Sequence, residues 1–274
     1  MTSSVQADNS QSLKDALHKA DENRSQGETY LRKAQHDYQQ ILEHLPVGHD
    51  RGLLVKKAWE AEQLLRSSSP YFSQAGQDRY LDERVFERKR NGIFVEIGAY
   101  DGVTGSNCLF FEAMRDWCGL VVEPSPVQFE AMAEFRRSTC VQAAIGPEEE
   151  IMDFIHVKQG YTQMSGLSEM YDDAILASVR KNPHHQEEIL QVSTRRLDIL
   201  LREHNILKVD YCSLDVEGAE LAILSSFPFD TFDIFAWTIE NGTRTRDIQN
   251  LMESKGYRLI TVIGCDEVYQ KSNS

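Results

Sequence analysis

The fold of this chain is decided by one stretch of its sequence, Gly92-Ile93-Phe94-Val95-Glu96-Ile97-Gly98-Ala99-Tyr100-Asp101-Gly102. Its mostly apolar first half is typical of a buried parallel strand, and its glycines allow a tight turn directly after that strand. A second apolar run, from Gly119 to Val122, ends at the acid Glu123. A strand, a glycine turn, a helix and a second strand ending in a carboxylate predict a nucleotide-binding α/β unit. In such a unit we expect Glu123 to accept hydrogen bonds from both ribose hydroxyls.

The spacing of the glycines in this loop bears on which nucleotide cofactor it binds. Gly98, Gly102 and Gly105 do not follow the dinucleotide pattern, and Tyr100 stands where its second glycine would let a pyrophosphate approach. Glu96, inside the strand, would repel a pyrophosphate but suits an ammonium group. S-adenosylmethionine (SAM) carries an ammonium, a sulfonium and a ribose, so the loop predicts SAM. The alternatives are an α/β turn without a ligand and a nicotinamide-dependent oxidoreductase, against which the glycine spacing argues.

Three motifs resemble, in the same order, those of the FkbM family of SAM-dependent methyltransferases. They are Ser73-Gln74-Ala75-Gly76-Gln77-Asp78-Arg79, then Phe94-Val95-Glu96-Ile97-Gly98-Ala99-Tyr100-Asp101-Gly102-Val103-Thr104-Gly105-Ser106-Asn107, and Ser213-Leu214-Asp215-Val216-Glu217-Gly218-Ala219-Glu220. The resemblance covers roughly residues 71–274. Two residues depart from the family pattern, Gln77 where many members have an acid and Tyr100 where a smaller polar residue is common.

The resemblance implies a fold and a reaction. The fold is the class I methyltransferase fold, a Rossmann-like doubly wound α/β sheet that is mostly parallel and has a C-terminal antiparallel hairpin. The reaction is methyl transfer from SAM to a hydroxyl, most often on a sugar or a secondary metabolite. We therefore expect a SAM-dependent O-methyltransferase with a sugar, glycan or small-molecule hydroxyl acceptor. The alternative from another class is a catalytically silent scaffold that uses the domain for binding.

The candidate cofactor-binding residues come from these motifs and from the expected strand ends. They are Gln74, Glu96, Gly98, Ala99, Tyr100, Asp101, Gly102, Ser106, Asn107, Glu123, Pro124, Ala143, Ala144 and Asp215. Residues 139–145 read as the third strand, whose end approaches the adenine in methyltransferases of this fold. The small side chains of Ala143 and Ala144 would leave room there for the ring.

The candidate catalytic residues are carboxylates at the ends of later strands. The runs 209–215 and 234–240 read as strands that end at Asp215 and Glu240, and Glu217 follows the first of them. Ligands of doubly wound sheets bind beyond the carboxyl ends of the strands, where the strand order switches. Asp215 is the first candidate for a general base and Glu240 the second, with His156 a weaker alternative.

The sequence has no Cys/His set with metal-ligand spacing, and we predict no metal site of that kind. The carboxylates Asp215, Glu217 and Glu240 could instead hold Mg²⁺ through oxygen ligands. A solvated rim of acids without a function is the plain alternative for these three residues.

Composition limits the classes of function. The 274 residues are 41% hydrophobic, which is enough for a core, and the net charge of −14 disfavours a nucleic-acid substrate. No apolar run approaches the roughly 20 residues of a membrane span, and residues 1–10 lack a signal-peptide core, so no membrane association is expected. The five scattered cysteines suit reduced thiols in a cytoplasmic protein.

The N-terminal part differs in kind from the rest of the chain. We expect a disordered tail at 1–10, a helical extension at 11–69 and the methyltransferase domain at 70–274. Apolar residues recur at helical spacing up to Leu45, with Gly27 as a candidate break, and a further helix is expected at 51–66. The spacing of Ala34, Tyr38, Ile41 and Pro46 resembles part of a tetratricopeptide repeat. Such a short array cannot bury its own faces, so the helices are expected to cover the domain or to bind a protein partner or a second copy of the chain.

Overall fold

The computed structural model describes residues 2–44, 65 and 70–272. The chain divides into two compact units, Met1–Pro70 and Tyr71–Ser274. In the first unit the described element is the 43-residue helix α1 (Thr2–His44). The predicted helix at 51–66 lies outside the described residues, apart from residue 65.

Helix α1 differs from the prediction in two ways. It begins at Thr2, so residues 2–10 are helical and form no disordered tail, and it passes through Gly27 without a break. A glycine inside a helix costs only about 1 kcal/mol relative to alanine, and the helix contains no proline. An ion pair one turn apart, between Arg24 Nη1 and Glu28 Oε1 at 2.8 Å, spans the glycine and supports the helix there.

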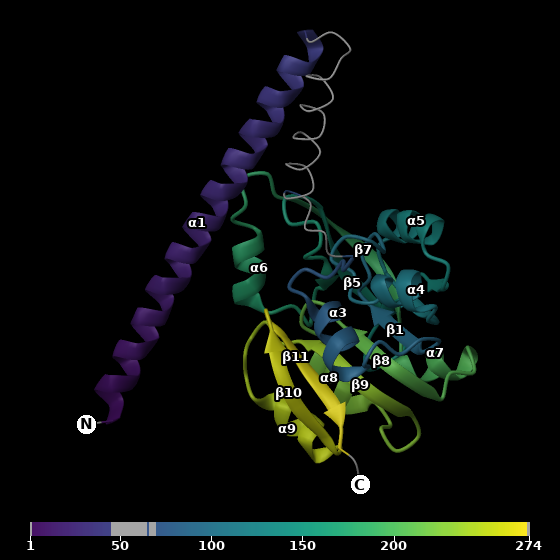
Figure 1. Cartoon of the computed structure of the whole chain (residues 1–274). Helices are drawn as coiled ribbons and strands as arrows, with labels where there is room; N and C mark the ends of the chain where they lie inside the picture. The colour runs from purple at the N-terminus through teal and green to yellow at the C-terminus, as the bar shows by residue number, and fades with distance from the viewer. Residues whose placement is uncertain (1, 45–64, 66–69, 273–274) are drawn as a thin grey trace. The chain divides into compact units, whose positions relative to one another are not determined.

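The second unit is built on a seven-stranded sheet (Figure 1). Its strands are β1 (Ile93–Ile97), β2 (Cys118–Val122), β3 (Thr139–Val141), β8 (Lys208–Leu214), β9 (Asp233–Glu240), β10 (Tyr257–Ile263) and β11 (Asp266–Lys271). Their order is β10-β11-β9-β8-β1-β2-β3. The strands from β9 to β3 run parallel, whereas β11 is antiparallel to both β9 and β10. This confirms the predicted doubly wound sheet with its C-terminal hairpin.

Helices cover both faces of this sheet, because successive residues of a strand point to opposite sides. Phe94 belongs to an apolar cluster with residues of η1, α4 and α5, and Val95 belongs to a second cluster with residues of α7, α8 and α9. The helices of the first layer are α3 (Gln77–Tyr80), the π-helical turn η1 (Leu81–Val85), α4 (Leu109–Arg115) and α5 (Pro126–Phe135). Those of the second layer are α7 (Leu197–Glu203), α8 (Glu220–Ser226) and α9 (Asp247–Ser254).

The second unit also contains a smaller, four-stranded sheet. Its presence changes the assignment of the predicted third strand. The smaller sheet has the order β4-β7-β5-β6, with β4 (Ala144–Ile145), β5 (Ile151–Gln159), β6 (Gly166–Leu167) and β7 (Gln186–Arg195), and α6 (Asp173–Val179) lies between β6 and β7 in the chain. The predicted strand at 139–145 is two strands, since β3 pairs with β2 whereas β4 pairs with β7. Ala143 and Ala144 therefore lie where the chain crosses from one sheet to the other.

The helices and the cysteines bear on the environment of the protein. None of the helices in the described part of the chain combines the length and the apolar character needed to cross a membrane. All five cysteines are free thiols, and Cys108 and Cys212 are fully buried.

Candidate active site

A cavity of about 590 Å³ lies at the carboxyl ends of β1 and β8, the two central strands from which the sheet grows in opposite directions. All of the predicted cofactor-binding residues line it except Asp101 and Gly102. The three predicted catalytic carboxylates, Asp215, Glu217 and Glu240, line it as well. The structure thus brings the two groups of candidate residues together in one cavity.

Gly98 begins the loop after β1 and lies against the end of β8. Its φ of +80° falls in the left-handed region, and a Cβ added there would be 1.7 Å from the carbonyl oxygen of Asp215. The sequence indicated one reason for a glycine here, the tight turn directly after the strand. The structure adds another reason for the glycine, the close approach of the backbone of the neighbouring strand.

Asp101 and Gly102 form the underside of the loop and do not face the cavity. Asp101 Oδ1 accepts hydrogen bonds from the amides of Val103 (2.9 Å) and Thr104 (2.7 Å), so this carboxylate caps the turn. A Cβ at Gly102, whose φ is +78°, would lie 2.9 Å from side-chain atoms of Arg136 and of Met132. Both residues shape the loop from outside the lining of the cavity, and their contact with a cofactor stays a prediction.

Glu123, at the end of β2, is buried and accepts two backbone hydrogen bonds. The amide of Tyr100 donates to Oε2 at 2.9 Å, and the amide of Ser125 donates to Oε1 at 2.8 Å. Burial raises the pKa of Glu123 to about 7, although these two hydrogen bonds act in the opposite direction. Each carboxylate oxygen can accept more than one hydrogen bond, so Glu123 has capacity left for two hydroxyl donors from the cavity.

Glu96 occupies a different setting from the one expected. Its Oε1 accepts from the hydroxyl of Ser106 (2.7 Å) and the amide of Asn107 (2.8 Å), and its Oε2 pairs with Arg136 Nη1 (2.7 Å). The period of two along β1 turns Glu96 toward the same face as Phe94, beneath α4 and α5. Its negative charge is therefore compensated by protein, which removes the electrostatic reason for assigning it to an ammonium group. Glu96 still lines the cavity, and its contact with a cofactor stays a prediction.

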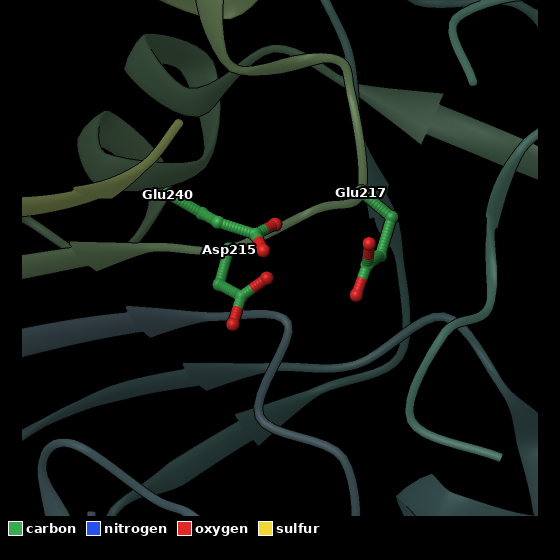
Figure 2. A group of neighbouring side chains, drawn as sticks. All are labelled: Asp215, Glu217 and Glu240. Atoms are coloured by element: carbon green, nitrogen blue, oxygen red, sulfur yellow. The ribbon is translucent and has the colours of Figure 1, made fainter. Parts of the chain in front are cut away.

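Asp215, Glu217 and Glu240 form a carboxyl cluster in the lining of the cavity, and Figure 2 shows Asp215 and Glu240 at the ends of neighbouring strands and Glu217 on the loop that follows β8. Their nearest oxygens all lie within 4.8 Å of one another, and each side chain is half-buried. Burial, followed by the charges of Glu240 and Asp266, raises the pKa of Asp215 well above its usual range. Burial and neighbouring carboxylates also raise the pKa of Glu217 to about 9 and that of Glu240 to about 8. Such a cluster can share a proton or hold a cation.

Asp266, at the start of β11, is a buried carboxyl of the cavity that the sequence reasoning missed. Gln77 Nε2 donates to Asp266 Oδ2 at 3.0 Å, across 189 residues of sequence. Position 77 is where the family pattern led us to expect an acid. An acid there would face the carboxylate of Asp266, whereas the amide of Gln77 supplies a donor. The departure at position 77 was therefore a usable signal for a second acid nearby.

Residues 96–259 match the methyltransferase FkbM domain. This chain belongs to the FkbM methyltransferase family. The match includes Glu96, the glycine loop, Glu123 and the whole carboxyl cluster, which agrees with the resemblance seen in the sequence.

Solved structures of other methyltransferases are similar to this FkbM protein at low sequence identity. The methyltransferase FkbM from Methylobacillus flagellatus KT has 11% identity and a TM-score of 0.46, with 85% of the present chain covered. The present chain spans 57% of the length of that protein. A TehB-like SAM-dependent methyltransferase from Corynebacterium glutamicum has 11% identity and a TM-score of 0.40, with 80% of this chain and 97% of that chain covered.

The N-terminal domain of human METTL16 in complex with SAH has 11% identity and a TM-score of 0.43, with 90% of this chain and 94% of that chain covered. No curated protein matches the sequence of this FkbM protein.

His156, the alternative base, lies outside the lining of the cavity in the FkbM domain. Its ring is buried on β5, where Nε2 is 3.3 Å from the hydroxyl of Ser125 and Nδ1 is 3.2 Å from Glu188 Oε1. The structure thus gives His156 two protein partners and no face toward the carboxyl cluster.

The raised pKa of Glu217 predicts that this carboxyl destabilises the FkbM domain. A carboxyl with a raised folded-state pKa penalises the folded state wherever it is ionised, so the penalty grows as the pH rises from 4.5 toward about 9. After allowance for partial exposure, Glu217→Gln should raise the free energy of unfolding at pH 8.5 by on the order of 1–2 kcal/mol. Urea unfolding at pH 5 and pH 8.5 measures this, and the gain should shrink at pH 5. The exposed Glu134→Gln on α5 is the control and should show no gain, and a loss of stability in Glu217→Gln at pH 8.5 would contradict the pKa assignment.

Proposed function

We propose that this protein transfers a methyl group from SAM to a hydroxyl of a sugar, a glycan or another small hydroxylated metabolite. One observation carries the proposal. A single cavity is lined by the glycine loop, by the buried carboxyl of Glu123 and by the cluster of Asp215, Glu217 and Glu240. The loop and Glu123 suit the adenosine of a cofactor, and the cluster suits the proton that a hydroxyl acceptor must lose.

The residues of the cavity fit SAM. Glu123 would hold the two ribose hydroxyls, and Ala143 and Ala144 leave space for the adenine beside the apolar side chain of Phe154. Asn107 Oδ1 is buried and has no hydrogen-bond partner among the described residues, although Asn107 lines the cavity. A buried acceptor without a partner is costly, and an ammonium donor from the ligand would satisfy it.

In the reaction, SAM supplies an electrophilic methyl group on a positively charged sulfur. Asp215 accepts the proton of the acceptor hydroxyl, so that the acceptor oxygen can form its bond to the methyl carbon as the carbon–sulfur bond breaks. Glu240 is the second candidate for this role. The products are the methyl ether, S-adenosylhomocysteine (SAH) and one proton, which the carboxyl cluster passes to solvent. Positioning of the two reactants in one cavity supplies much of the rate.

The same three carboxylates have the ligand chemistry for a divalent cation, which would activate the hydroxyl directly. EDTA distinguishes the two versions of the proposal. Loss of turnover with EDTA that Mg²⁺ restores assigns the cluster to a metal, and unchanged turnover assigns Asp215 to proton transfer.

The charge of the lining supports an acceptor without phosphate groups. Among the described residues, no lysine, arginine or histidine lines the cavity, whereas six carboxylates do, namely Glu96, Glu123, Asp215, Glu217, Glu240 and Asp266. Such a cavity offers no cation to pair with the phosphates of nucleic acids or nucleotide sugars, and it suits the neutral hydroxyls of a glycoside. With five free thiols, we also propose a reducing location such as the cytoplasm.

Cofactor binding is the first test of the proposal. SAH should bind the wild-type protein in calorimetry, and Glu123→Ala should weaken it at least about tenfold, because a hydrogen bond to a charged group is worth roughly 1.5–3 kcal/mol. Since hydroxyls bind the ionised carboxylate and the pKa of Glu123 is about 7, wild-type affinity should rise from about pH 6 through 7 and level off about one pH unit above that pKa. Glu123→Ala should lose this pH dependence. Unchanged affinity in the folded variant would refute the ribose assignment.

Turnover is the second test. Wild-type protein, SAM and a panel of neutral glycosides and polyhydroxylated metabolites are incubated together, and methyl transfer is followed by mass spectrometry. A methylated product supports the proposal. SAM binding without turnover across the panel favours the non-catalytic scaffold, and NADH binding in place of SAM favours an oxidoreductase.

A further inference from the structure

Arg136 lies directly after α5 with its side chain fully buried beneath the glycine loop. Its Nη1 donates to Glu96 Oε2 (2.7 Å), to the carbonyl of Gly102 (3.1 Å) and to the hydroxyl of Ser106 (3.3 Å). Its Nε donates to Glu112 Oε2 on α4 at 2.9 Å. One guanidinium therefore forms hydrogen bonds to β1, to the middle of the loop, to the residue that caps the start of α4, and to a side chain within α4.

The contacts of Arg136 span the whole loop that forms one wall of the cavity. Glu96 lies two residues before Gly98, Gly102 stands at the centre of the loop, and Ser106 caps the amide of Leu109 at the start of α4 (2.9 Å). Neither Arg136 nor Glu112 lines the cavity itself. We infer that Arg136 is a positioning residue, which holds the loop of residues 98–107 in the conformation that accepts the cofactor while touching no ligand.

The electrostatics of the site explain why an arginine is needed at this position. Burial alone would raise the pKa of Glu112, but the charge and hydrogen bond of Arg136 and the amide of Arg137 hold it below the usual range. Burial likewise opposes the charge of Arg136, and Glu96 and Glu112 more than offset it, so that the pKa of Arg136 is raised. A planar guanidinium reaches acceptors along two edges at once, which the single ammonium of a lysine cannot do.

This arrangement predicts which part of the cofactor depends on Arg136. Because Arg136 neutralises Glu96 and fixes the loop backbone, its effect should reach the nucleoside part of the ligand. If the Glu96–Arg136 pair instead acted on the amino-acid part, only ligands with an ammonium would be affected. SAH and 5′-methylthioadenosine, which lacks the amino-acid part, separate these two mechanisms.

The inference rests on the proposed function, and the test is calorimetry of both ligands with Arg136→Lys. We expect SAH and 5′-methylthioadenosine each to bind at least about tenfold more weakly, because the charge-assisted network that holds the loop is lost for both ligands. The matched control is Arg115→Lys. Arg115 also pairs with a buried acid, Asp82 (2.7 Å and 2.8 Å), and both residues lie outside the cavity lining. Arg115→Lys should lower the melting temperature but change both affinities less than about twofold.

A second variant tests the same inference if Arg136→Lys does not fold. Glu112→Gln keeps the shape of the side chain, removes the charge that anchors Nε, and lies outside the cavity lining. This variant should lower the affinity for both ligands about three- to fivefold, because it loosens the same loop.

Unchanged affinities in Arg136→Lys and Glu112→Gln would overturn the inference. A loss confined to SAH would overturn it too, and so would an equal loss in Arg115→Lys, which would point to general destabilisation. Failure of the wild-type protein to bind either ligand contradicts the proposed function itself and is thereby distinguished from failure of the inference.

Discussion

Asp215→Asn is expected to lower kcat by about 10²–10⁴, while affinity for SAH stays within about threefold of the wild type. The substitution keeps the shape of the side chain and removes its ability to accept the proton of the acceptor. Asp215 follows β8 and Glu123 follows β2, and these strands lie on opposite sides of β1, so the adenosine contacts should survive. The measurement is kcat on the best acceptor of the panel, together with calorimetry of SAH.

The control for this variant is Asp210→Asn on the same strand. Asp210 faces away from the cavity lining, where it accepts from the amide of Ile93 (3.0 Å) and pairs with Lys89 (2.6 Å). Its kcat should remain within about twofold of the wild type. If Asp215→Asn instead greatly weakens cofactor binding while kcat at saturating SAM is normal, Asp215 is a cofactor ligand and Glu240 becomes the better candidate for the base.

Gly98→Ala is expected to reduce affinity for SAH by at least about 100-fold, even though alanine is the smallest side chain that can be added. Its Cβ would lie 1.7 Å from the carbonyl oxygen of Asp215, a backbone atom that cannot move without shifting β8. A left-handed φ adds a further cost of about 1–2 kcal/mol. The two strand ends that form the cavity would have to separate, which displaces both the glycine loop and the carboxyl cluster.

Gly256→Ala separates the collision from the backbone strain. Gly256 has a φ of +82°, close to the +80° of Gly98, but no atom lies within 4 Å of an added Cβ. This variant should lose stability without losing SAH affinity, as judged by thermal unfolding and calorimetry. If Gly98→Ala behaves like Gly256→Ala, the approach of β8 is not what requires the glycine.

The sequence predicted the parts of the site that follow from strand ends. Glu123, Asp215 and Glu240 each end a readable apolar run, and parallel strands bring such ends to one rim of the sheet. The need for glycines in the loop was likewise evident from the sequence. The structure adds the protein atoms that an added Cβ would meet, on Asp215 at Gly98 and on Arg136 at Gly102. These features depend on local pattern and on one topological rule, which is why they could be predicted.

The features that were missed depend on contacts distant in sequence. The partner of Glu96 is Arg136, 40 residues away, and no local pattern indicates that pairing. The orientation of Glu96 was nevertheless open to prediction, because it stands two residues after Phe94 and so faces the same helices. The division of the expected third strand depends on β7, which comes about 50 residues later and draws Ala144 into a different sheet.

The position of β11 has a consequence for the synthesis of this protein. β11 lies between β9 and β10, so a strand that is synthesised after β10 enters the interior of the sheet and not its edge. Asp266 at its start holds Gln77, near the beginning of the domain, and both residues line the cavity. A nascent chain that has emerged only as far as β10 therefore lacks one wall of its site. Ligand binding must wait until β11 has emerged and paired, and a ribosome-stalled chain that ends at β10 should have no affinity for SAH.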